Sequence, residues 1–367
     1  MNIINKSNLL RLIAFFLTAT VMCCTFGFTT DGWKIKKTND PQDQSNITAS
    51  PEHKEEEREN DSAPEDEIIV EPIYINPLTG EEDTEEAATS FPLSFVIDGN
   101  SPAYGVSNAD VLIDFPTENN NSRYLCITTK YTDIWKIGSL SPTRGYITNL
   151  ASFFGADIIS YGKDDLADYD SCNFINKSID ISLESAKYYT EYGKYIFTCS
   201  DLFLNEQELL PASLEDERVF PFEFISYDDE PISFEKEVTR VMIKESVTTL
   251  TELVFDESTG NYKISKNGSS VREASNGEIQ LFENCLVLFA DSVTYDLSSY
   301  NQTVVHTLGT GTGFYFTEGT AEEIIWTSDS DGNMRINDIE GNLLTFNTGR
   351  TYIKYLKASQ KENIHFS

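Results

Sequence analysis

The sequence predicts an α+β protein in which a mixed α/β domain is followed by a β-rich domain. Between residues 91 and 160, three apolar, strand-like runs precede one segment with helical spacing and a further short apolar run, an order typical of a mixed α/β layer. After residue 219, short β-branched runs recur about every ten residues, separated by glycine and asparagine turns, which indicates a β-rich unit.

The first 28 residues are predicted to be an export signal or a membrane anchor. Lys6 and Arg11 precede an uncharged, largely apolar run of 17 residues, Leu12–Phe28. Three outcomes are open: acylation at Cys23 or Cys24 as in a bacterial lipoprotein, ordinary cleavage, or retention as an anchor, for which the run is at the short edge of the roughly 17–25 residues needed to span. Each outcome places the rest of the chain outside the cytoplasmic membrane, either attached to its outer face or secreted.

Residues 29–75 are predicted to form a disordered acidic linker. They are mostly polar and charged and contain few aromatic side chains, so they cannot bury enough apolar surface to offset the entropy of ordering. Residues 51–90 contain 15 aspartates and glutamates but only two cations, and like charges extend such a segment. The linker would hold the folded part away from the membrane.

The first folded domain is expected over residues 76–218. Its strand-like runs are Phe91–Ile97, Ala109–Phe115 and Tyr124–Lys130, and a short apolar strand is expected at 156–160. A helix is predicted over Pro142–Phe154, ended by Gly155, and two more around Leu183–Tyr192 and Glu206–Leu210.

The second domain is expected over residues 219–360, and each domain is long enough to form a core of its own. The predicted strands are Val238–Ile243, Glu252–Phe255, Tyr262–Ser265, Cys285–Ala290, Thr303–Leu308, Gly313–Thr317, Glu323–Thr327 and Thr351–Lys357. Gly309–Gly313 lacks the lysine and the following helix of a phosphate loop, so a hairpin or bulge is expected there. Asp329–Asn333 differs from a calcium loop in its early glycine and its flanking strands, which favours a β-turn.

The formal net charge of −33 argues against nucleic acid as a partner, because phosphate binding needs a basic face. It also argues against direct adsorption to an anionic lipid surface. The charge fits either solubility or attraction to cations and basic partners in the cell wall. Four cysteines follow the signal, and their spacing fits no metal site; they are either buried thiols or include a Cys172–Cys199 bridge. The other two are Cys126 and Cys285.

Few residues in the sequence are suited to catalysis. The chain has three histidines, of which His53 falls in the linker, His365 in the C-terminal tail and His306 in a predicted strand, so the first domain has no histidine base and no zinc site. We therefore expect no metal and no cofactor. Carboxylates remain as candidates, because paired carboxylates can hydrolyse a glycoside or hold a divalent cation. Those at the ends of predicted strands are Asp98, Asp110 and Asp114.

Arg123 and Arg144 are the candidate ligand-binding cations of the first domain. An arginine fork suits a carboxylate or phosphate ligand. The competing interpretation is an internal salt bridge to Asp98 or Asp114. If a ligand site exists, these five side chains should meet in one pocket.

Several segments, in order, resemble a known family. They are NPLTG at 76–80, FVIDGN at 95–100, NADVLIDF at 108–115, SRYLCI at 122–127, IGSLSPTR at 137–144, VFDESTGNYKISKNG at 254–268, NCLVLFA at 284–290, GTGFYFTEGTAEEIIW at 311–326 and NTGRTYIKY at 347–355. This series resembles the YerB-like lipoproteins of Gram-positive bacteria, the DUF3048 family. The resemblance implies an N-terminal α/β domain, a β-rich C-terminal domain and a lipid-anchored envelope protein, but no established activity.

The chain resembles a diverged member whose site is eroded. Of the family's GPVRSAR-type segment, little besides Gly138 and Arg144 is kept, and Ser160-Tyr161-Gly162 stands where the family has a histidine. The leading hypothesis is a non-catalytic, surface-anchored envelope protein that binds a cell-wall polymer or another envelope protein. The alternative is a carboxylate-dependent, cation-assisted hydrolase of cell-wall glycans.

Overall fold

The computed structural model describes residues 72–118, 121–131, 134–166, 178–183, 188–191, 194–198, 225–228, 230–298 and 300–367. The predicted signal, most of the linker, Cys172, Cys199 and the helix expected at 206–210 lie outside these ranges. The last linker residues are ordered, since β1 (Tyr74–Ile75) pairs with β2 (Glu82–Asp83). Within the described ranges, no helix is long and apolar enough to cross a membrane.

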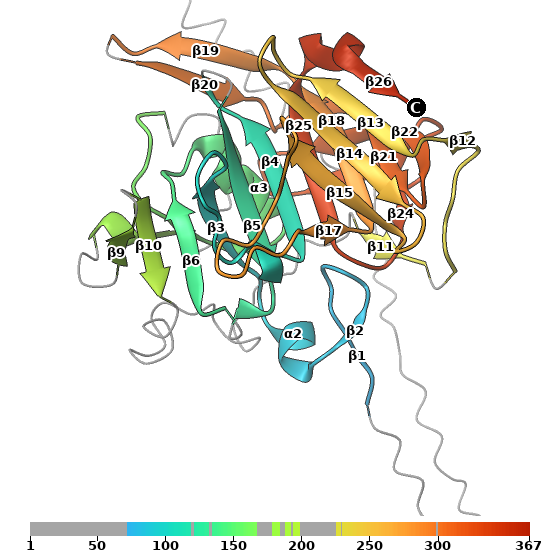
Figure 1. Cartoon of the computed structure of the whole chain (residues 1–367), viewed down its shortest axis with the longest axis horizontal. Helices are drawn as coiled ribbons and strands as arrows, with labels where there is room; N and C mark the ends of the chain where they lie inside the picture. Colours follow the sequence, from blue (N-terminus) through green and yellow to red (C-terminus); the bar gives the residue numbers. More distant parts are fainter. Residues whose placement is uncertain are drawn as a thin grey trace, which may run out of the picture. The chain divides into compact units, whose positions relative to one another are not determined.

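One sheet of 14 strands combines strands from both predicted domains (Figure 1). Its main path is β12 (Lys236–Glu237), β22 (Thr320–Ser328), β21 (Gly309–Thr317), β18 (Asn284–Ala290), β25 (Thr351–Lys357), β4 (Val111–Pro116), β5 (Ser122–Thr128), β3 (Leu93–Asp98), β6 (Lys136–Leu140), β10 (Lys194–Thr198) and β9 (Tyr188–Glu191). Three further strands pair beside it: β23 (Met334–Asp338) with β22, β7 (Asp157–Ser160) with β3, and β8 (Ser178–Asp180) with β7.

The junction between the two halves of the chain is the parallel pair β25–β4. Thr351 lies opposite Val111 and Lys354 opposite Asp114, so strands more than two hundred residues apart in sequence share a ladder. Both buried clusters mix the two halves: Leu112 packs in one cluster with Leu253, and Leu125 in the other with Trp326. Within the described ranges, the two predicted domains therefore share their cores, although each is long enough to form a core of its own.

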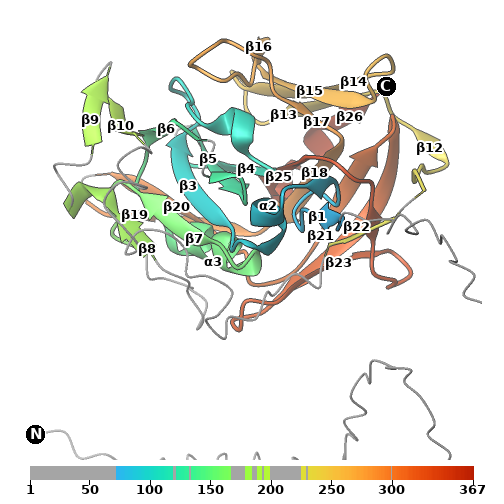
Figure 2. The same ribbon diagram turned by 90° about the horizontal axis from the view of Figure 1, so that it is seen from below.

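A second sheet covers one face of the long sheet, and α3 (Gly145–Phe153) covers the other (Figure 2). The second sheet consists of β16 (Ser269–Ser270), β15 (Asn261–Lys266), β14 (Leu250–Asp256), β13 (Arg240–Lys244) and β26 (Ile364–Phe366), with β17 (Leu281–Phe282) beside β15. The remaining elements are short: α2 (Glu85–Thr89), η1 (Val106–Asn108), η4 (Ile181–Leu183), η5 (Ala358–Asn363), and the strand pairs β11 (Ser226–Tyr227) with β24 (Thr345–Phe346) and β19 (Ser292–Asp296) with β20 (Asn301–Val305).

The predicted helix over 142–154 is confirmed as α3, and every one of its residues is buried. It ends just before Gly155, whose φ of 62° is the left-handed conformation that glycine adopts without strain. The helix expected around Leu183–Tyr192 is wrong, because β9 occupies its second half. The Tyr-Tyr-Thr sequence of β9 favours an extended ladder, and it pairs residue for residue with β10.

Gly309–Gly313 lie in a hairpin, as expected, but in its first strand and not at its turn: they form the first half of β21 and pair regularly with β22. The glycines serve close packing. A Cβ on Gly311 would lie 2.5 Å from the ring of Trp326, and one on Gly313 would lie 2.5 Å from the carbonyl oxygen of Val287. Asp329–Asn333 forms the expected turn, held by hydrogen bonds to the Asp329 carboxylate.

Candidate functional site

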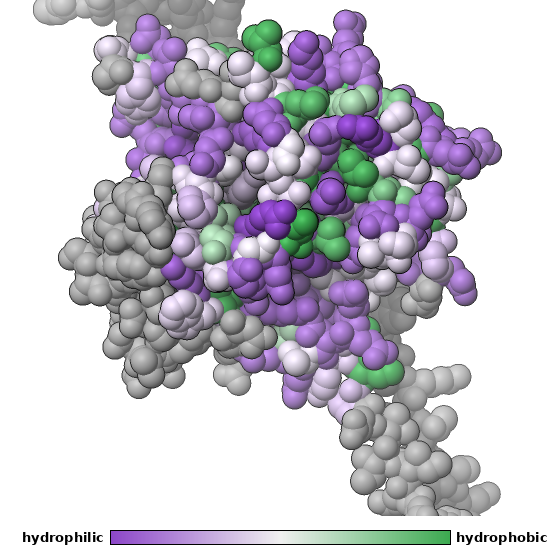
Figure 3. Space-filling view, in the orientation of Figure 1, coloured by the Kyte–Doolittle hydropathy of each residue, from purple (hydrophilic) through white to green (hydrophobic). Residues whose placement is uncertain are grey.

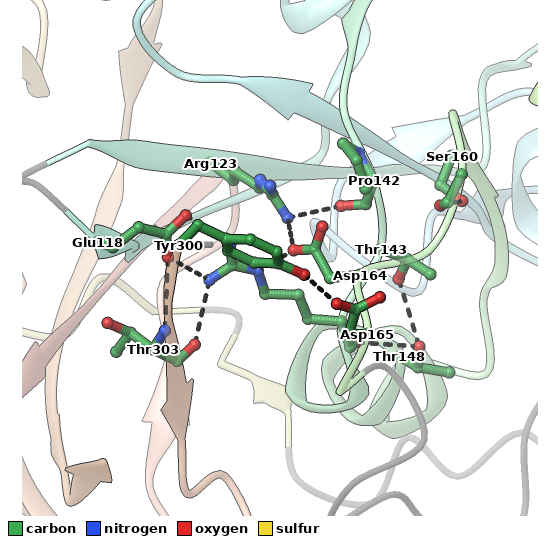
Figure 4. A network of polar contacts seen from close by, with 12 residues as sticks. Glu118, Arg123, Pro142, Thr143, Thr148, Ser160, Asp164, Asp165, Tyr300 and Thr303 are labelled. Atoms are coloured by element: carbon green, nitrogen blue, oxygen red, sulfur yellow. Dashed lines mark hydrogen bonds and ion pairs between the residues drawn. The ribbon is translucent and has the colours of Figure 1, made fainter. Parts of the chain in front are cut away.

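Arg123 and Arg144 meet at a single carboxylate, that of Asp164. Figure 4 shows Arg123 beside Asp164 and Pro142. Arg123, on β5, donates from Nη1 to Asp164 at 2.9 Å and to the carbonyl oxygen of Pro142 at 2.8 Å. Arg144, the residue before α3, donates from Nε to the same Asp164 oxygen. The two arginines are therefore brought together, as expected for a shared site, but around an internal acid.

Arg144 has a second acidic partner in Glu118. Its Nη1 and Nη2 donate to the two carboxylate oxygens at 2.9 and 2.8 Å, and Nη1 also donates to the carbonyl oxygen of Thr303 at 3.1 Å. Burial would raise the pKa of Glu118, but the hydrogen bonds from Arg144 hold it below its ordinary value. Every nitrogen of the Arg144 guanidinium is thus used by the protein itself.

The predicted partners of the arginines, Asp98 and Asp114, are wrong. Asp98 lies opposite Arg123 in the β3–β5 ladder, but its carboxylate accepts from the backbone N–H of Asn100 at 3.0 Å and from the Ser101 hydroxyl at 2.6 Å, which fixes the turn after β3. The true partners, Glu118 and Asp164, belong to loops, and no strand or helix pattern points to them.

Asp114 lies in a different, largely buried network. Its Oδ2 accepts from Lys354 Nζ at 2.9 Å and from the Tyr352 hydroxyl at 2.9 Å, while Lys354 also contacts Glu245 Oε2 at 3.1 Å. The Lys354 side chain has no exposed surface. Burial lowers the pKa of Lys354, but Asp114 and Glu245 outweigh it and raise the pKa above its ordinary value. This triad ties β4, β25 and the turn after β13 together.

Asp110 lies in a third place, at the start of β4. It accepts from the backbone N–H of Thr129 at 2.9 Å and from the Asn76 amide at 3.4 Å, and Lys130 lies 4.0 Å away. Burial raises the pKa of Asp110 above its ordinary value, and these donors only partly counter it. Through Asn76, this carboxylate holds the turn at residues 76–80 against the sheet.

The five predicted site residues therefore do not share one pocket. Asp114 shares its face of the sheet with Leu112 on β4 and Tyr124 on β5, and both belong to the core under the second sheet. Arg123 shares its face of β5 with Leu125, which belongs to the core under α3. Alternate residues of a strand point to opposite faces, so Asp114 and Arg123 point away from each other. A paired-carboxylate site made of Asp98, Asp110 and Asp114 is not formed. Among the residues that the structure describes, no group of three metal-ligating side chains comes together either.

A groove of about 660 Å³, here called the basic groove, lies where the two halves of the chain meet. It is lined by Gly99–Ala103, Tyr124, Lys266, Asn267, Ser269–Ala274 and Gly277. One wall follows strand β3 and the other belongs to the turn and loop after β15. On the face that carries the second sheet, hydrophilic side chains predominate and apolar atoms form small separate patches (Figure 3).

Glu273 fastens the two walls of the basic groove. Its Oε2 accepts from the backbone N–H groups of Gly105 at 2.8 Å and Ser107 at 3.3 Å, and its Oε1 accepts from the N–H and hydroxyl of Ser275 at 3.1 and 2.7 Å. This carboxylate is buried and fully used. Sequence reasoning missed it, because a lone glutamate in a loop carries no recognisable spacing.

In the described part of the chain, the cations of the basic groove donate hydrogen bonds only to neutral groups and form no ion pair, although the charge of Lys266 also attracts the Glu245 carboxylate. Lys266 Nζ donates to Ser122 Oγ at 3.0 Å and to Asn100 Oδ1 at 3.4 Å, and Arg272 Nη1 donates to the carbonyl oxygen of Gly277 at 2.8 Å. Both keep donors for a ligand, unlike Arg144. The groove therefore offers positive charge together with hydroxyl and amide groups.

Comparison with known families agrees with this architecture. The N-terminal domain of a protein family of unknown function, DUF3048, matches residues 78–196, and the C-terminal domain of the same family matches residues 240–353. The chain belongs to the DUF3048 family. The predicted resemblance is thus confirmed, and the basic groove lies between segments of the two family domains.

One solved structure is similar in fold, that of the YerB protein from Bacillus subtilis. The match has a TM-score of 0.63 and 17% sequence identity, and it covers 80% of this chain and 99% of that chain. At this identity the likeness concerns the fold. No curated protein matches the chain.

Proposed function

We propose that this DUF3048 protein is an envelope protein that binds an anionic cell-wall polymer in the basic groove. The observation that carries the proposal is the pair Lys266 and Arg272, two cations that line the groove and form no ion pair in the described ranges of a chain whose net charge is −33. The acidic surface of the protein repels anions, so the positive charge of this groove would attract anionic ligands to this one place.

The other groups of the groove suit a polymer rich in hydroxyls. Asn100, Asn267, Ser269 and Ser270 line it with amide and hydroxyl groups, and Tyr124 contributes a ring. Amides and hydroxyls both donate and accept, which is the chemistry that sugar hydroxyls require. Phosphate and carboxylate groups on such a polymer would contact Lys266 and Arg272.

The test is binding of the full chain, purified in a non-ionic detergent, to anionic polymer extracted from cell walls. Lys266→Glu and Arg272→Glu should each weaken binding about tenfold, since each reverses a charge that faces the ligand. Lys263→Glu is the matched control, because Lys263 lies on the same strand, is exposed and does not line the groove. Equal losses in all three variants would show general electrostatics and refute the assignment of the groove.

The N-terminal attachment belongs to the same proposal. Export and anchoring through residues 1–28 would place the groove beside the wall, and acylation at Cys23 or Cys24 is the form that the family resemblance favours. Mass spectrometry of the purified chain and membrane fractionation of Cys23→Ser and Cys24→Ser variants separate the three kinds of processing. A full-length, unmodified N-terminus in the membrane fraction would identify an anchor instead of a lipoprotein.

A further inference from the structure

A second groove, of about 560 Å³, lies beside strands β22 and β23 of the long sheet and has the opposite character. It is here called the acidic groove. Its lining residues are Asp228, Ile232, Phe234, Glu322, Asp338–Glu340 and Leu343–Thr345. We propose that it binds a basic, partly apolar peptide segment of a partner protein. This inference is independent of the polymer proposed for the basic groove.

The floor of the acidic groove exposes large apolar side chains to solvent. Ile339 is 63% exposed and Leu343 44% exposed, and both lie beside the partly buried Ile232 and Phe234. A peptide that covered Ile339 and Leu343 would remove this apolar surface from water, which is the main source of affinity in such contacts.

The floor is also held rigidly. The Asn347 side chain accepts from the Ile232 N–H at 2.6 Å and donates to the Ile232 carbonyl oxygen at 2.8 Å, and the Phe234 ring packs edge-on against Tyr315 at 5.7 Å. A groove that is already shaped loses little conformational entropy when a ligand binds. The apolar part of the groove is therefore preorganised.

The rim carries four carboxylates, those of Asp228, Glu322, Asp338 and Glu340, and no lysine or arginine lines it. Asp338 is fixed in place, because its Oδ1 accepts from the backbone N–H groups of Glu340 and Asn342, both at 2.9 Å. Burial, followed by the charges of Asp338 and Glu323, raises the pKa of Glu322 above its ordinary value. A cationic ligand would relieve this crowding, so charge complementarity indicates a basic partner.

The nearest lysine along the adjoining strand does not neutralise the rim. Lys236, on β12, places its ammonium 4.3 Å from the centre of the Phe366 ring and 5.6 Å from that of Phe314. Phe314 belongs to the core under the second sheet, whereas Leu344 of the acidic groove belongs to the core on the opposite face. The long sheet thus separates this cation from the carboxylates.

The experiment uses a fluorescein-labelled hexapeptide of alternating lysine and leucine, with binding to the full chain in non-ionic detergent followed by fluorescence anisotropy and a detergent-only blank subtracted. Two double variants probe the two halves of the site: Glu322→Gln with Glu340→Gln, and Ile339→Ser with Leu343→Ser. Each should weaken binding at least about tenfold. The matched controls, Glu362→Gln and Val247→Ser, change an exposed acid and a 95% exposed valine outside the groove and should leave binding within about twofold.

Two further peptides distinguish specific binding in the acidic groove from purely electrostatic or purely hydrophobic attraction. A lysine–serine hexapeptide keeps the charge and loses the apolar side chains, and a glutamate–leucine hexapeptide reverses the charge; both should bind at least about tenfold more weakly. The proposal is overturned if the first peptide does not bind above the blank, if the lysine–serine peptide binds equally well, or if either double variant binds like the wild type.

Discussion

Replacing Lys354 by methionine should be among the most destabilising single changes in the described part of this protein. The side chain is fully buried between Asp114 Oδ2 at 2.9 Å and Glu245 Oε2 at 3.1 Å. Methionine has a similar length but no charge, so Lys354→Met leaves two buried carboxylates without their cation. Asp114 would keep the hydrogen bond from Tyr352, while its Oδ1 has no partner.

The magnitude follows from the burial of all three groups. Removing one partner of a buried ion pair costs about 3–5 kcal/mol, because the remaining charge is left in a poorly solvated site. Two carboxylates are left here, but Glu245 also accepts from the Thr251 hydroxyl at 2.5 Å, which moderates its loss. We therefore expect Lys354→Met to lower the free energy of unfolding by about 4 kcal/mol.

Urea unfolding of the full chain in detergent, followed by tryptophan fluorescence, measures this loss, since Trp326 lies in the core. The exposed Lys263→Met is the control and should change the free energy of unfolding by less than about 0.5 kcal/mol. A triple variant, Lys354→Met with Asp114→Asn and Glu245→Gln, removes all three charges and should recover much of the loss. A cost below about 1 kcal/mol for Lys354→Met, or a triple variant no more stable than the single one, would refute the reasoning.

Three further predictions concern two ion pairs and one closely packed glycine. Burial raises the pKa of Glu245, but Lys354 outweighs it and holds the pKa below the ordinary 4.5. The ion pair therefore stabilises the fold fully above pH 4.5, and this stabilisation is lost as the pH falls through the lower pKa of the folded state. Glu245→Gln should reduce this loss of stability at acid pH when the free energy of unfolding is measured against pH. A lysine at position 144 cannot contact both Glu118 oxygens and Asp164 at once. Arg144→Lys should therefore lower the free energy of unfolding by about 2–4 kcal/mol in urea titrations, whereas Arg272→Lys, at an exposed position, should leave it unchanged. Gly80→Ala should cost at least about 1–2 kcal/mol by the same assay, because φ is +69° and the new Cβ would lie 2.3 Å from the Tyr227 ring; Gly260→Ala, with φ of +70° and open space, separates the backbone cost from the clash.

The strands that were predicted correctly are those in which local pattern and burial agree. Cys285–Ala290 and Thr351–Lys357 are nearly continuous apolar or β-branched runs, and they become the buried neighbours β18 and β25. The parallel pairing of β25 with β4 could not be predicted, because the contact is made between strands far apart in the sequence. That single pairing turns two expected domains into one continuous sheet, and periodicity within either half carries no trace of it.

The fate of the arginines shows why the site was harder to predict than the fold. The sequence predicted that Arg123 and Arg144 lie close together, and in the structure they do meet. However, an arginine that binds a ligand cannot be distinguished by sequence pattern from one that binds a carboxylate of a loop. The distinction depends on Asp164, a loop residue whose position is set only by the assembled structure. Lys266 was overlooked for a related reason, because whether a cation is held in an ion pair depends on which carboxylates come close to it in the folded chain. A family site in this chain is therefore better sought among its unpaired cations than among its best-matched ones.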